Sequence, residues 1–444
     1  MNLKDERKRN GGGEKNKTEL LKNKLLFSLL LLFLSFPEAE ILHAQSNLTA
    51  SPYTRNGYGI LADQSFASQK GMGGVGYGVR NSQIMNPLNP ASFSAVDSMT
   101  FMLDFAVKGQ AGWLEDGANK ATRYNAGLEY LALQFPLAKA LGMGVGFEPV
   151  SYVGYRYADE SDIPSIPSGQ SQTIYNGNGG LKKVYGALSY CVQSRLSVGV
   201  NVGYLFGDVV NSSVTSVNVT SANTFFKSDT LRSSALIYEF GLQYRHPFGK
   251  DKEIVVGAVY TPKIKTGATL MQGEAYYSPA NQVTGNPIYR TTRDSVFELP
   301  ETYAAGISYS KVNKWVVAAD FQYQKWAEAK FYDQTNQLTN RMKINAGAEF
   351  IPNYQGHNFF SKMRYRAGAC YTNSYFKVHG FGYQEYSASV GFGIPMVDRR
   401  SFLNLAFEYS MLHPQSNTLV KEQYVKFTLG YTFNELWFFK RKLQ

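Results

Sequence analysis

The chain has 444 residues, with 45 Lys and Arg against 34 Asp and Glu, and two cysteines. Its charged fraction of 18% lies below the roughly 25% of soluble domains and its aromatic fraction is 14%, so an intrinsically disordered chain is excluded. Two cysteines also exclude a scaffold held together by many disulfides.

An apolar segment at residues 25–36 follows a basic stretch near the start of the chain. It is too short for a membrane-spanning helix, which needs about 20 residues. We therefore predict a secretory signal peptide at residues 1–44, and the alternative of a membrane anchor or buried helix fits the length less well. Removing this leader takes away eight Lys and Arg and six Asp and Glu, so the formal net charge changes from +11 to +9.

Residues 45–98 contain clustered glycines and two Asn-Pro steps and alternate poorly. We expect a hatch segment that plugs the inside of a barrel. Within it Gly71, Gly73 and Gly76 fit the G-x-G-x-x-G pattern. The prolines that follow interrupt any helix, so a tight turn in the plug fits this motif better than a dinucleotide site. We expect no cofactor, metal site or enzymatic activity.

Apolar residues recur at every second position through most of residues 99–436, as at Leu196, Val198, Val200 and Val202. This period of two predicts strands with one apolar and one polar face. The predicted strands are 99–108, 123–135, 140–157, 181–192, 195–209, 230–246, 252–269, 293–311, 313–326, 341–352, 362–373, 383–395, 401–412 and 421–434.

These fourteen strands are longer than the 5–6 residues usual in a β-sandwich and suit a tilted membrane-spanning strand. Long polar segments, which we predict to be loops on one side of the barrel, alternate with short turns; the long segments are 159–179, 211–228, 271–290 and 328–340. The sequence thus predicts an all-β protein, a transmembrane antiparallel barrel at residues 99–436, with a basic tail at 437–444.

Pro149 lies in the middle of the third predicted strand. Proline cannot donate a ladder hydrogen bond, so it implies a bulge, a kink or a local gap in the barrel wall. The alternative is that the strand ends at Pro149 and residues 150–157 belong to a loop.

Two motifs together resemble the FadL family of outer-membrane transporters for hydrophobic compounds. The family's hatch carries an Asn-Pro-Ala motif, which matches Asn89, Pro90 and Ala91. The family's second motif spans a pair of strands. Its residues match Leu299, Pro300, Glu301, Gly306, Tyr309, Trp315, Asp320, Tyr323 and Trp326.

The resemblance implies a fourteen-stranded barrel in the outer membrane of a Gram-negative bacterium. It also implies passive uptake of long-chain fatty acids or similar compounds, with lateral exit near the third strand. The alternative is a FadL-like barrel that shuttles cargo proteins in type IX secretion. Expected partners are outer-membrane lipid, a hydrophobic ligand and, for the alternative, secreted proteins; we expect a monomer and no nucleic acid.

Members of the family that carry fatty acids place cationic groups in their pockets to meet the carboxylate of the ligand. Alternation puts four cations on the polar faces of this chain, and these are the candidates. They are Arg341, Lys343, Arg364 and Arg366. A wetted interior in which they pair with local carboxylates is the competing interpretation.

Overall fold

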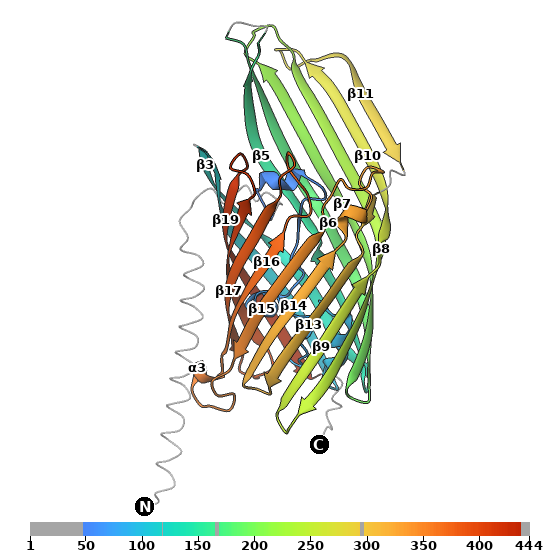
Figure 1. Ribbon diagram of the computed structural model, residues 1–444, viewed down its shortest axis with the longest axis vertical. Coiled ribbons are helices and arrows are strands. Elements are labelled where there is room, and N and C mark those ends of the chain that lie inside the picture. The colour runs from blue at the N-terminus through green and yellow to red at the C-terminus, as the bar shows by residue number, and fades with distance from the viewer. Residues whose placement is uncertain (1–47, 118, 165–167, 294–296, 437–444) are drawn as a thin grey trace, which may run out of the picture. The chain divides into compact units, whose positions relative to one another are not determined.

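The computed structural model describes residues 48–117, 119–164, 168–293 and 297–436. The predicted signal peptide and basic tail lie outside this part of the chain. The described residues are almost entirely β-structure (Figure 1). The helical elements are η1 (Pro52–Arg55), α2 (Ala67–Lys70), η2 (Pro90–Ala95), η3 (Trp326–Glu328) and α3 (Phe359–Lys362). None of the described helices is long and apolar enough to cross a membrane.

Neighbouring strands pair antiparallel around a ring that closes where β19 pairs with β2. The first half of the ring is β2 (Thr100–Asp116), β3 (Asn119–Ala138), β4 (Leu141–Pro149), β5 (Ser151–Asp162), β6 (Gln170–Val192), β7 (Leu196–Val217), β8 (Thr224–Phe248), β9 (Lys252–Thr261) and β10 (Ile264–Tyr277). The second half is β12 (Phe297–Leu299), β13 (Thr302–Lys311), β14 (Trp315–Gln324), β15 (Arg341–Phe350), β16 (Arg364–Asn373), β17 (Tyr383–Pro395), β18 (Phe402–Pro414) and β19 (Lys421–Leu436).

The ring has the fourteen positions that the sequence predicts. Of the 19 strands in the sheet, β1 (Ile60–Leu61) and β11 (Val283–Arg293) lie outside the ring. Three positions are each shared by two successive strands: β4 with β5, β9 with β10, and β12 with β13. The predicted all-β membrane barrel is therefore confirmed.

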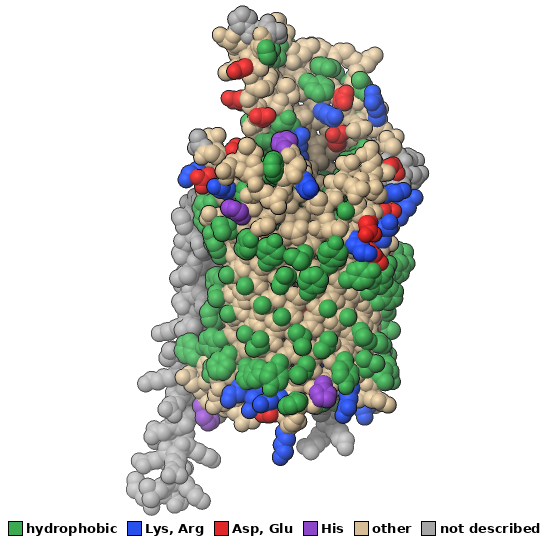
Figure 2. Space-filling model, viewed as in Figure 1, with side chains coloured by type: hydrophobic (Ala, Val, Ile, Leu, Met, Phe, Trp, Pro, Cys, Tyr) green, Lys and Arg blue, Asp and Glu red, His purple; other side chains and the backbone are tan. Residues whose placement is uncertain are grey.

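Residues that alternate along each strand lie on opposite sides of the barrel wall, one side facing outward and the other facing the inside of the barrel. On β7, Val198 and Tyr204 are 43% and 50% exposed, whereas Ser197 and Asn201 are buried. Figure 2 shows the result on one face of the barrel, a band of apolar side chains with charged side chains gathered toward the two ends. This is the outer surface that a barrel needs in lipid.

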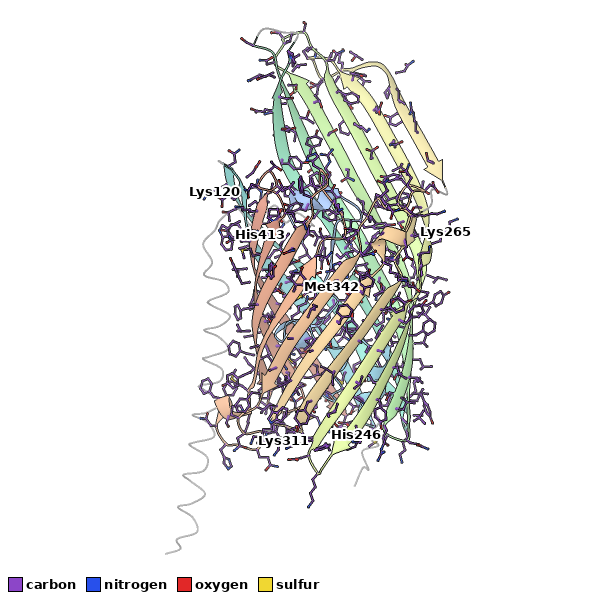
Figure 3. All side chains as sticks on the ribbon, in the orientation of Figure 1. Lys120, His246, Lys265, Lys311, Met342 and His413 are labelled. Atoms are coloured by element: carbon purple, nitrogen blue, oxygen red, sulfur yellow. The ribbon has the colours of Figure 1, made fainter. Side chains whose placement is uncertain are left out.

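Five strands of the ring continue far beyond the rest of the wall and, together with β11, form a sheet that rises above it, which we call the extension (Figure 1). It contains β5, β6, β7, β8, β10 and β11, of which β8 alone has 25 residues. Most of segments 159–179, 211–228 and 271–290 belongs to these strands, so their prediction as loops was wrong. In Figure 3, Lys311 and His246 mark the opposite end of the barrel.

Candidate functional site: the filled lumen and the wall seam

Residues 48–98, which we call the lumenal segment, fill the inside of the barrel. Their backbone touches the wall where the wall has glycine, because a Cβ there would overlap backbone atoms of the segment. These wall glycines lie on seven strands of the ring, and they are Gly142, Gly199, Gly257, Gly306, Gly347, Gly368 and Gly391. Small residues on the inner face thus allow close backbone contact. Whether the segment moves as a hatch stays a prediction.

The Asn-Pro-Ala motif forms the start of η2 within this segment. The Asn89 side chain accepts a hydrogen bond from the Ala91 N–H (3.0 Å) and donates to the carbonyl oxygens of Tyr77 (3.0 Å) and Leu242 (3.1 Å). It therefore caps a helix and binds β8 at the same time. The Ala91 carbonyl accepts from Ser189 on β6 (2.7 Å). The motif serves as an anchor between the segment and the wall.

The glycine-rich motif is a tight turn, because Gly73 and Gly74 both have positive φ (70° and 80°). It ends on Asp320 of β14, whose carboxylate accepts hydrogen bonds from the backbone N–H groups of Gly76 (2.6 Å) and Tyr77 (2.9 Å). A buried carboxylate that receives two backbone donors forms strong, charge-assisted hydrogen bonds. Asp320 thus fastens the turn to the wall.

We expect Asp320→Ala to loosen the lumenal segment, with a loss of roughly 2–4 kcal/mol of stability, because two hydrogen bonds to a charged group disappear. Asp320→Asn should lose less, since its amide oxygen still accepts both N–H groups. Hydrogen exchange of the Gly76 and Tyr77 amides in the purified barrel measures this. Equal protection in the Ala variant and the unchanged protein would contradict the role given to Asp320.

The wall has a seam beside Pro149, the predicted kink. Pro149 is the last residue of β4 and pairs with Lys182 on β6, and β5 resumes pairing with β6 from Val153 to Asp162. Pairing between β3 and β4 begins at Leu131 opposite Phe147 and runs away from the kink. In the described residues β3 does not pair with β5, so the wall parts between them. The strand does not end in a loop at Pro149; it bends.

The lumenal segment covers this seam from inside. β1 pairs with β5 at Tyr152 and Ser151, and Thr54 and Gly154 exchange two hydrogen bonds (3.1 and 3.2 Å). Leu48 packs on β3 so closely that a Cβ on Gly127 would lie 3.0 Å from its side chain. The seam is therefore open in backbone pairing but filled by side chains.

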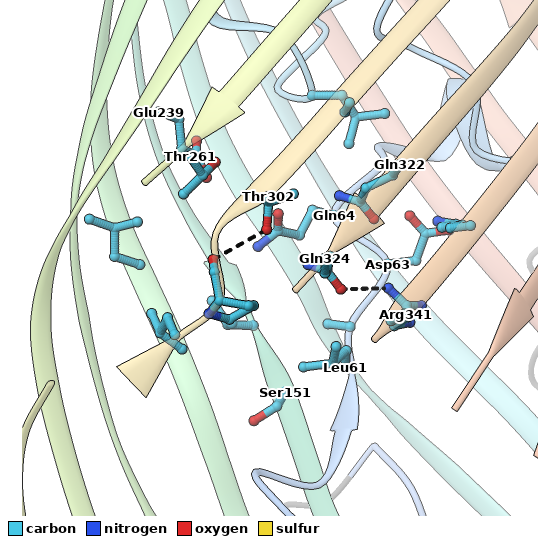
Figure 4. A pocket seen from close by; sticks show the side chains of 18 of the residues that line it. Leu61, Asp63, Gln64, Ser151, Glu239, Thr261, Thr302, Gln322, Gln324 and Arg341 are labelled. Carbon is cyan, nitrogen blue, oxygen red and sulfur yellow. Dashed lines mark hydrogen bonds and ion pairs between the residues drawn. The ribbon is translucent and has the colours of Figure 1, made fainter. Parts of the chain in front are cut away.

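Two small cavities lie inside the barrel on either side of residues 61–63. The first, of about 140 Å³, is lined by residues such as Leu61, Glu239, Thr302 and Arg341 (Figure 4). The second, of about 100 Å³, is lined by Leu48 and Tyr152 at the seam and by Lys108. Leu61, Ala62, Asp63, Arg341 and Lys343 line both.

An aromatic cluster adjoins the first cavity. Tyr58 and Trp326 line it, with ring centroids 6.0 Å apart, and Trp326 stacks near Tyr375 at 4.6 Å. All three side chains are nearly inaccessible to solvent. The cavities are thus small, and their walls combine aromatic, aliphatic and charged groups.

Most charges around the cavities are paired. Lys343 lies 3.3 Å from Asp63, and Lys183 contacts both Glu148 (2.9 Å) and Glu239 (3.1 Å). Burial raises the pKa of the Asp63 carboxyl, but Lys343, Lys70 and hydrogen bonds from Ser65 together lower it by more, so this pKa lies below its usual range. The Asp63 carboxylate therefore stays charged and holds Lys343.

Arg341 and Lys108 differ from these groups. Among the described residues neither has a carboxylate within 4.0 Å. Arg341 donates to the amide oxygen of Gln324 (3.3 Å), and the Lys108 amine lies 5.7 Å from the ring centre of Tyr152. They are the two cations at the cavities that are free to meet an anionic group.

Arg364 and Arg366 do not belong to the cavities. Both bind Glu349, at 2.9 and 2.7 Å, and all three side chains are buried. They form a structural cluster that also reaches Gln83 of the lumenal segment (2.7 Å from Arg364). Of the four predicted cations, then, Arg341 and Lys343 line the cavities and only Arg341 is unpaired.

The second family motif does not form one site. Gly306 and Asp320 contact the lumenal segment, and Trp326 is buried in the aromatic cluster. Glu301 sits on the outer surface, where it accepts from Lys325 (3.0 Å) and Tyr260 (2.9 Å). Leu299 lies at the end of β12 and Pro300 follows it. The Tyr323 hydroxyl accepts a hydrogen bond from Asn340 (2.9 Å). Trp315 packs edge-on against Tyr309 at the opposite end of β14.

Sequence reasoning missed Lys108 and Leu48. Lys108 lies on the inner face of β2, and the alternation of that strand places it there, so it was accessible to the same argument as Arg341. Leu48 had no such signal. Among the described residues, no group of three or more His, Cys, Asp and Glu side chains could hold a metal ion.

A family model described as BamG matches residues 23–444 of the sequence. The chain belongs to the BamG family. A search of curated proteins finds no significant match.

Several solved structures share the fold of this BamG-family protein. The CymD monoaromatic hydrocarbon channel is 16% identical, with a TM-score of 0.56 over 83% of this chain and 97% of that chain. The toluene transporter TodX from P. putida is 14% identical (TM-score 0.57; 84% and 99% covered). A FadL homologue from Pseudomonas aeruginosa is 12% identical (TM-score 0.57; 84% and 99% covered). The FadL-like fold inferred from the motifs is therefore confirmed.

Proposed function

We propose that this protein lets hydrophobic compounds cross the outer membrane and releases them sideways through the seam between β3 and β5. The observation that carries the proposal is that the second cavity reaches the seam, where Leu48 and Tyr152 line it together with Lys108. The named functions of TodX and CymD support a compound of this class. Passage requires no chemistry on the ligand.

We further propose that the compound carries a carboxylate, as a fatty acid does. Arg341 and Lys108 would bind its charge, because a buried carboxylate needs such a partner. The cavity of about 140 Å³ is far below the roughly 300–1,000 Å³ of sites that enclose drug-sized ligands. A long acyl chain must therefore displace Leu48 or the aromatic cluster, so uptake involves movement of the lumenal segment.

The seam is tested with Gly127→Trp, which places a large side chain against Leu48. We expect uptake of radiolabelled oleate by cells to fall at least roughly tenfold, since a well-packed path cannot expand around an indole. Gly109→Trp is the matched control: it lies on the neighbouring strand, opposite Ala126, and a Cβ there meets nothing within 4 Å. Methyl oleate, which lacks the charge, should be taken up less well than oleate by the unchanged protein.

Uptake that is normal in Gly127→Trp overturns the lateral route. Equal uptake of oleate and its methyl ester overturns the carboxylate proposal but leaves the route standing. If neither compound is carried, a protein-binding role is favoured, for which the large polar extension offers a surface. A stoichiometric secreted protein that copurifies from outer membranes only when the extension is intact would then support the shuttle.

A further inference from the structure

The turn between β13 and β14 and the connection between β15 and β16 carry positive charge at the end of the barrel opposite the extension. Residues 311–314 and 351–363 contain three lysines and one histidine but no acidic residue. Figure 2 shows basic side chains just beyond the apolar band at this end, where Figure 3 labels Lys311. Short turns mark the periplasmic side of an outer-membrane barrel. We call Lys311, Lys314, His357 and Lys362 the basic rim.

The two lysines that give the rim its net charge lie on either side of the end of β15. The Ile351 N–H, at the start of the connection, donates to the Lys314 carbonyl oxygen (2.8 Å), and Lys362 lies at the end of the same connection. β15 pairs with β14 on one side and with β16 on the other. Lys311 is neutralised by Asp251 (2.9 Å), so the positive charge of the rim comes from Lys314 and Lys362.

α3, which contains Lys362, lies at the outer edge of the wall (Figure 1). The outward-facing Tyr365 of β16 alternates with two buried arginines, and its hydroxyl donates to the Phe360 carbonyl oxygen (3.0 Å). The Phe360 side chain is 61% exposed. Aromatic residues on the outside of a membrane protein favour the interface between lipid and water. Lys362 therefore lies at the depth of the lipid headgroups.

A groove lies on the lipid-facing side of the wall next to the rim, and we call it the wall groove. Its volume is about 800 Å³, within the roughly 300–1,000 Å³ of sites that hold small ligands. Tyr309, Trp315 and Val317 form one side of it. Its floor consists of small outward-facing side chains on β14, β15 and β16, which are Ala319, Ala346, Ala348, Ala367 and Ala369.

The depth of the groove matches one leaflet of a bilayer. Trp315 and the 49% exposed Phe350 are paired neighbours, and they separate the lysines of the rim from the alanines of the floor. Ala346 lies four positions before Phe350, which is about 13 Å along the strand. Half of the hydrocarbon core is roughly 15 Å thick. A lipid with its headgroup at the rim can therefore place an acyl chain along the groove without crossing the midplane.

The lumenal segment supports the floor of the groove from inside the barrel. A Cβ on Gly347 or Gly368, which alternate with the floor alanines, would overlap backbone atoms of Met72. The wall is therefore packed against the turn of the lumenal segment and cannot close the groove by moving inward. A groove that exists before its ligand binds needs no reorganisation, which favours binding.

We propose that the wall groove and the basic rim bind an anionic glycerophospholipid of the periplasmic leaflet. One acyl chain lies on the alanine floor beside Tyr309 and Trp315, and the phosphate group meets Lys314 and Lys362. Apolar contact retains the chain of any phospholipid, whereas the lysines select an acidic headgroup. The proposal does not depend on the lateral route, since the seam lies on other strands of the ring.

Native mass spectrometry tests the headgroup selection. The protein is purified in detergent and receives either dioleoyl phosphatidylglycerol or dioleoyl phosphatidylethanolamine, which differ in headgroup charge but not in chains. We expect one phosphatidylglycerol per barrel, retained at least roughly fivefold more tightly than phosphatidylethanolamine, because each lysine near a headgroup contributes about that factor. Lys314→Gln with Lys362→Gln should remove the preference. The matched control, Lys139→Gln with Lys250→Gln, removes the same charge from exposed positions on other short turns and should keep it.

A second pair of variants tests the groove itself. Ala346→Phe fills the floor and should lower retention of phosphatidylglycerol at least roughly fivefold, since the acyl chain loses its contact area. Ala388→Phe is the control, because Ala388 is exposed on β17 at the level of Ala369 but does not line the groove.

Equal retention of the two lipids by the unchanged protein overturns the proposal, and so does a preference that survives the change of both rim lysines. Unchanged lipid retention in Ala346→Phe overturns it as well. If that variant instead loses a copurifying outer-membrane protein, the groove is a protein contact and not a lipid site. The lysine variants lie in surface turns, so the test of the headgroup stands even if Ala346→Phe fails to fold.

Discussion

Gly257→Val should push the lumenal segment off the barrel wall and make the protein permeable to small hydrophilic solutes. Gly257 lies on β9, paired with Gly306, and a Cβ there would overlap the carbonyl oxygen of Tyr77. A backbone atom on each side cannot yield as a flexible side chain does, so the cost is ~3 kcal/mol or more. A barrel of this width encloses a water-filled channel unless something fills it.

Liposome swelling in arabinose measures the expected permeability, and thermal unfolding measures the loss of stability. Gly109→Val is the control, because it adds the same side chain to the outer face of β2, where a Cβ meets nothing within 4 Å. A Gly257→Val protein that neither swells liposomes nor unfolds at a lower temperature would show that the segment does not depend on this contact.

The fold was predictable because strands in a barrel wall meet lipid on one side and packed or wetted residues on the other. All fourteen ring positions could be found from that contrast. The extension was predicted as loops and not as strands. Both faces of its sheet lie outside the wall, so its residues show little contrast between a lipid-facing and an inward-facing side. Tyr289 on β11 is 80% exposed and lies among Thr, Arg and Asn residues, which reads as a loop.

The candidate site was only partly predictable for a related reason. Alternation assigns a residue to the inner face, which correctly places Arg341 and Lys343 at the lumen. It does not give the register between strands, and the connection of residues 351–363 leaves the offset of β15 and β16 open. That offset sets Arg366 opposite Glu349. Contacts between the lumenal segment and the wall join residues that are even further apart in the sequence, so alternation does not predict them either.

Glu349→Ala should destabilise the protein by roughly 3–5 kcal/mol, because it leaves two buried guanidinium groups without their carboxylate. The side chains of Arg364 and Arg366 are 3% and 1% exposed, and within the described part of the chain Arg366 retains only Asn404 (2.8 Å) as a further side-chain acceptor. The control is Glu301→Ala, which breaks a partly exposed ion pair with Lys325 and should cost at most about 1 kcal/mol.

Urea unfolding of the two variants in detergent gives the comparison. A third variant separates loss of attraction from an uncompensated charge: replacing Glu349, Arg364 and Arg366 together by methionine removes all three charges while keeping much of their volume. We expect it to be close to the unchanged protein in stability, since apolar residues often substitute for a buried ion cluster without cost. If the triple variant is as unstable as Glu349→Ala, the cluster stabilises the barrel through its hydrogen bonds to Gln83 and Asn404, and the arginines are then anchors for the lumenal segment and not merely neutralised charges.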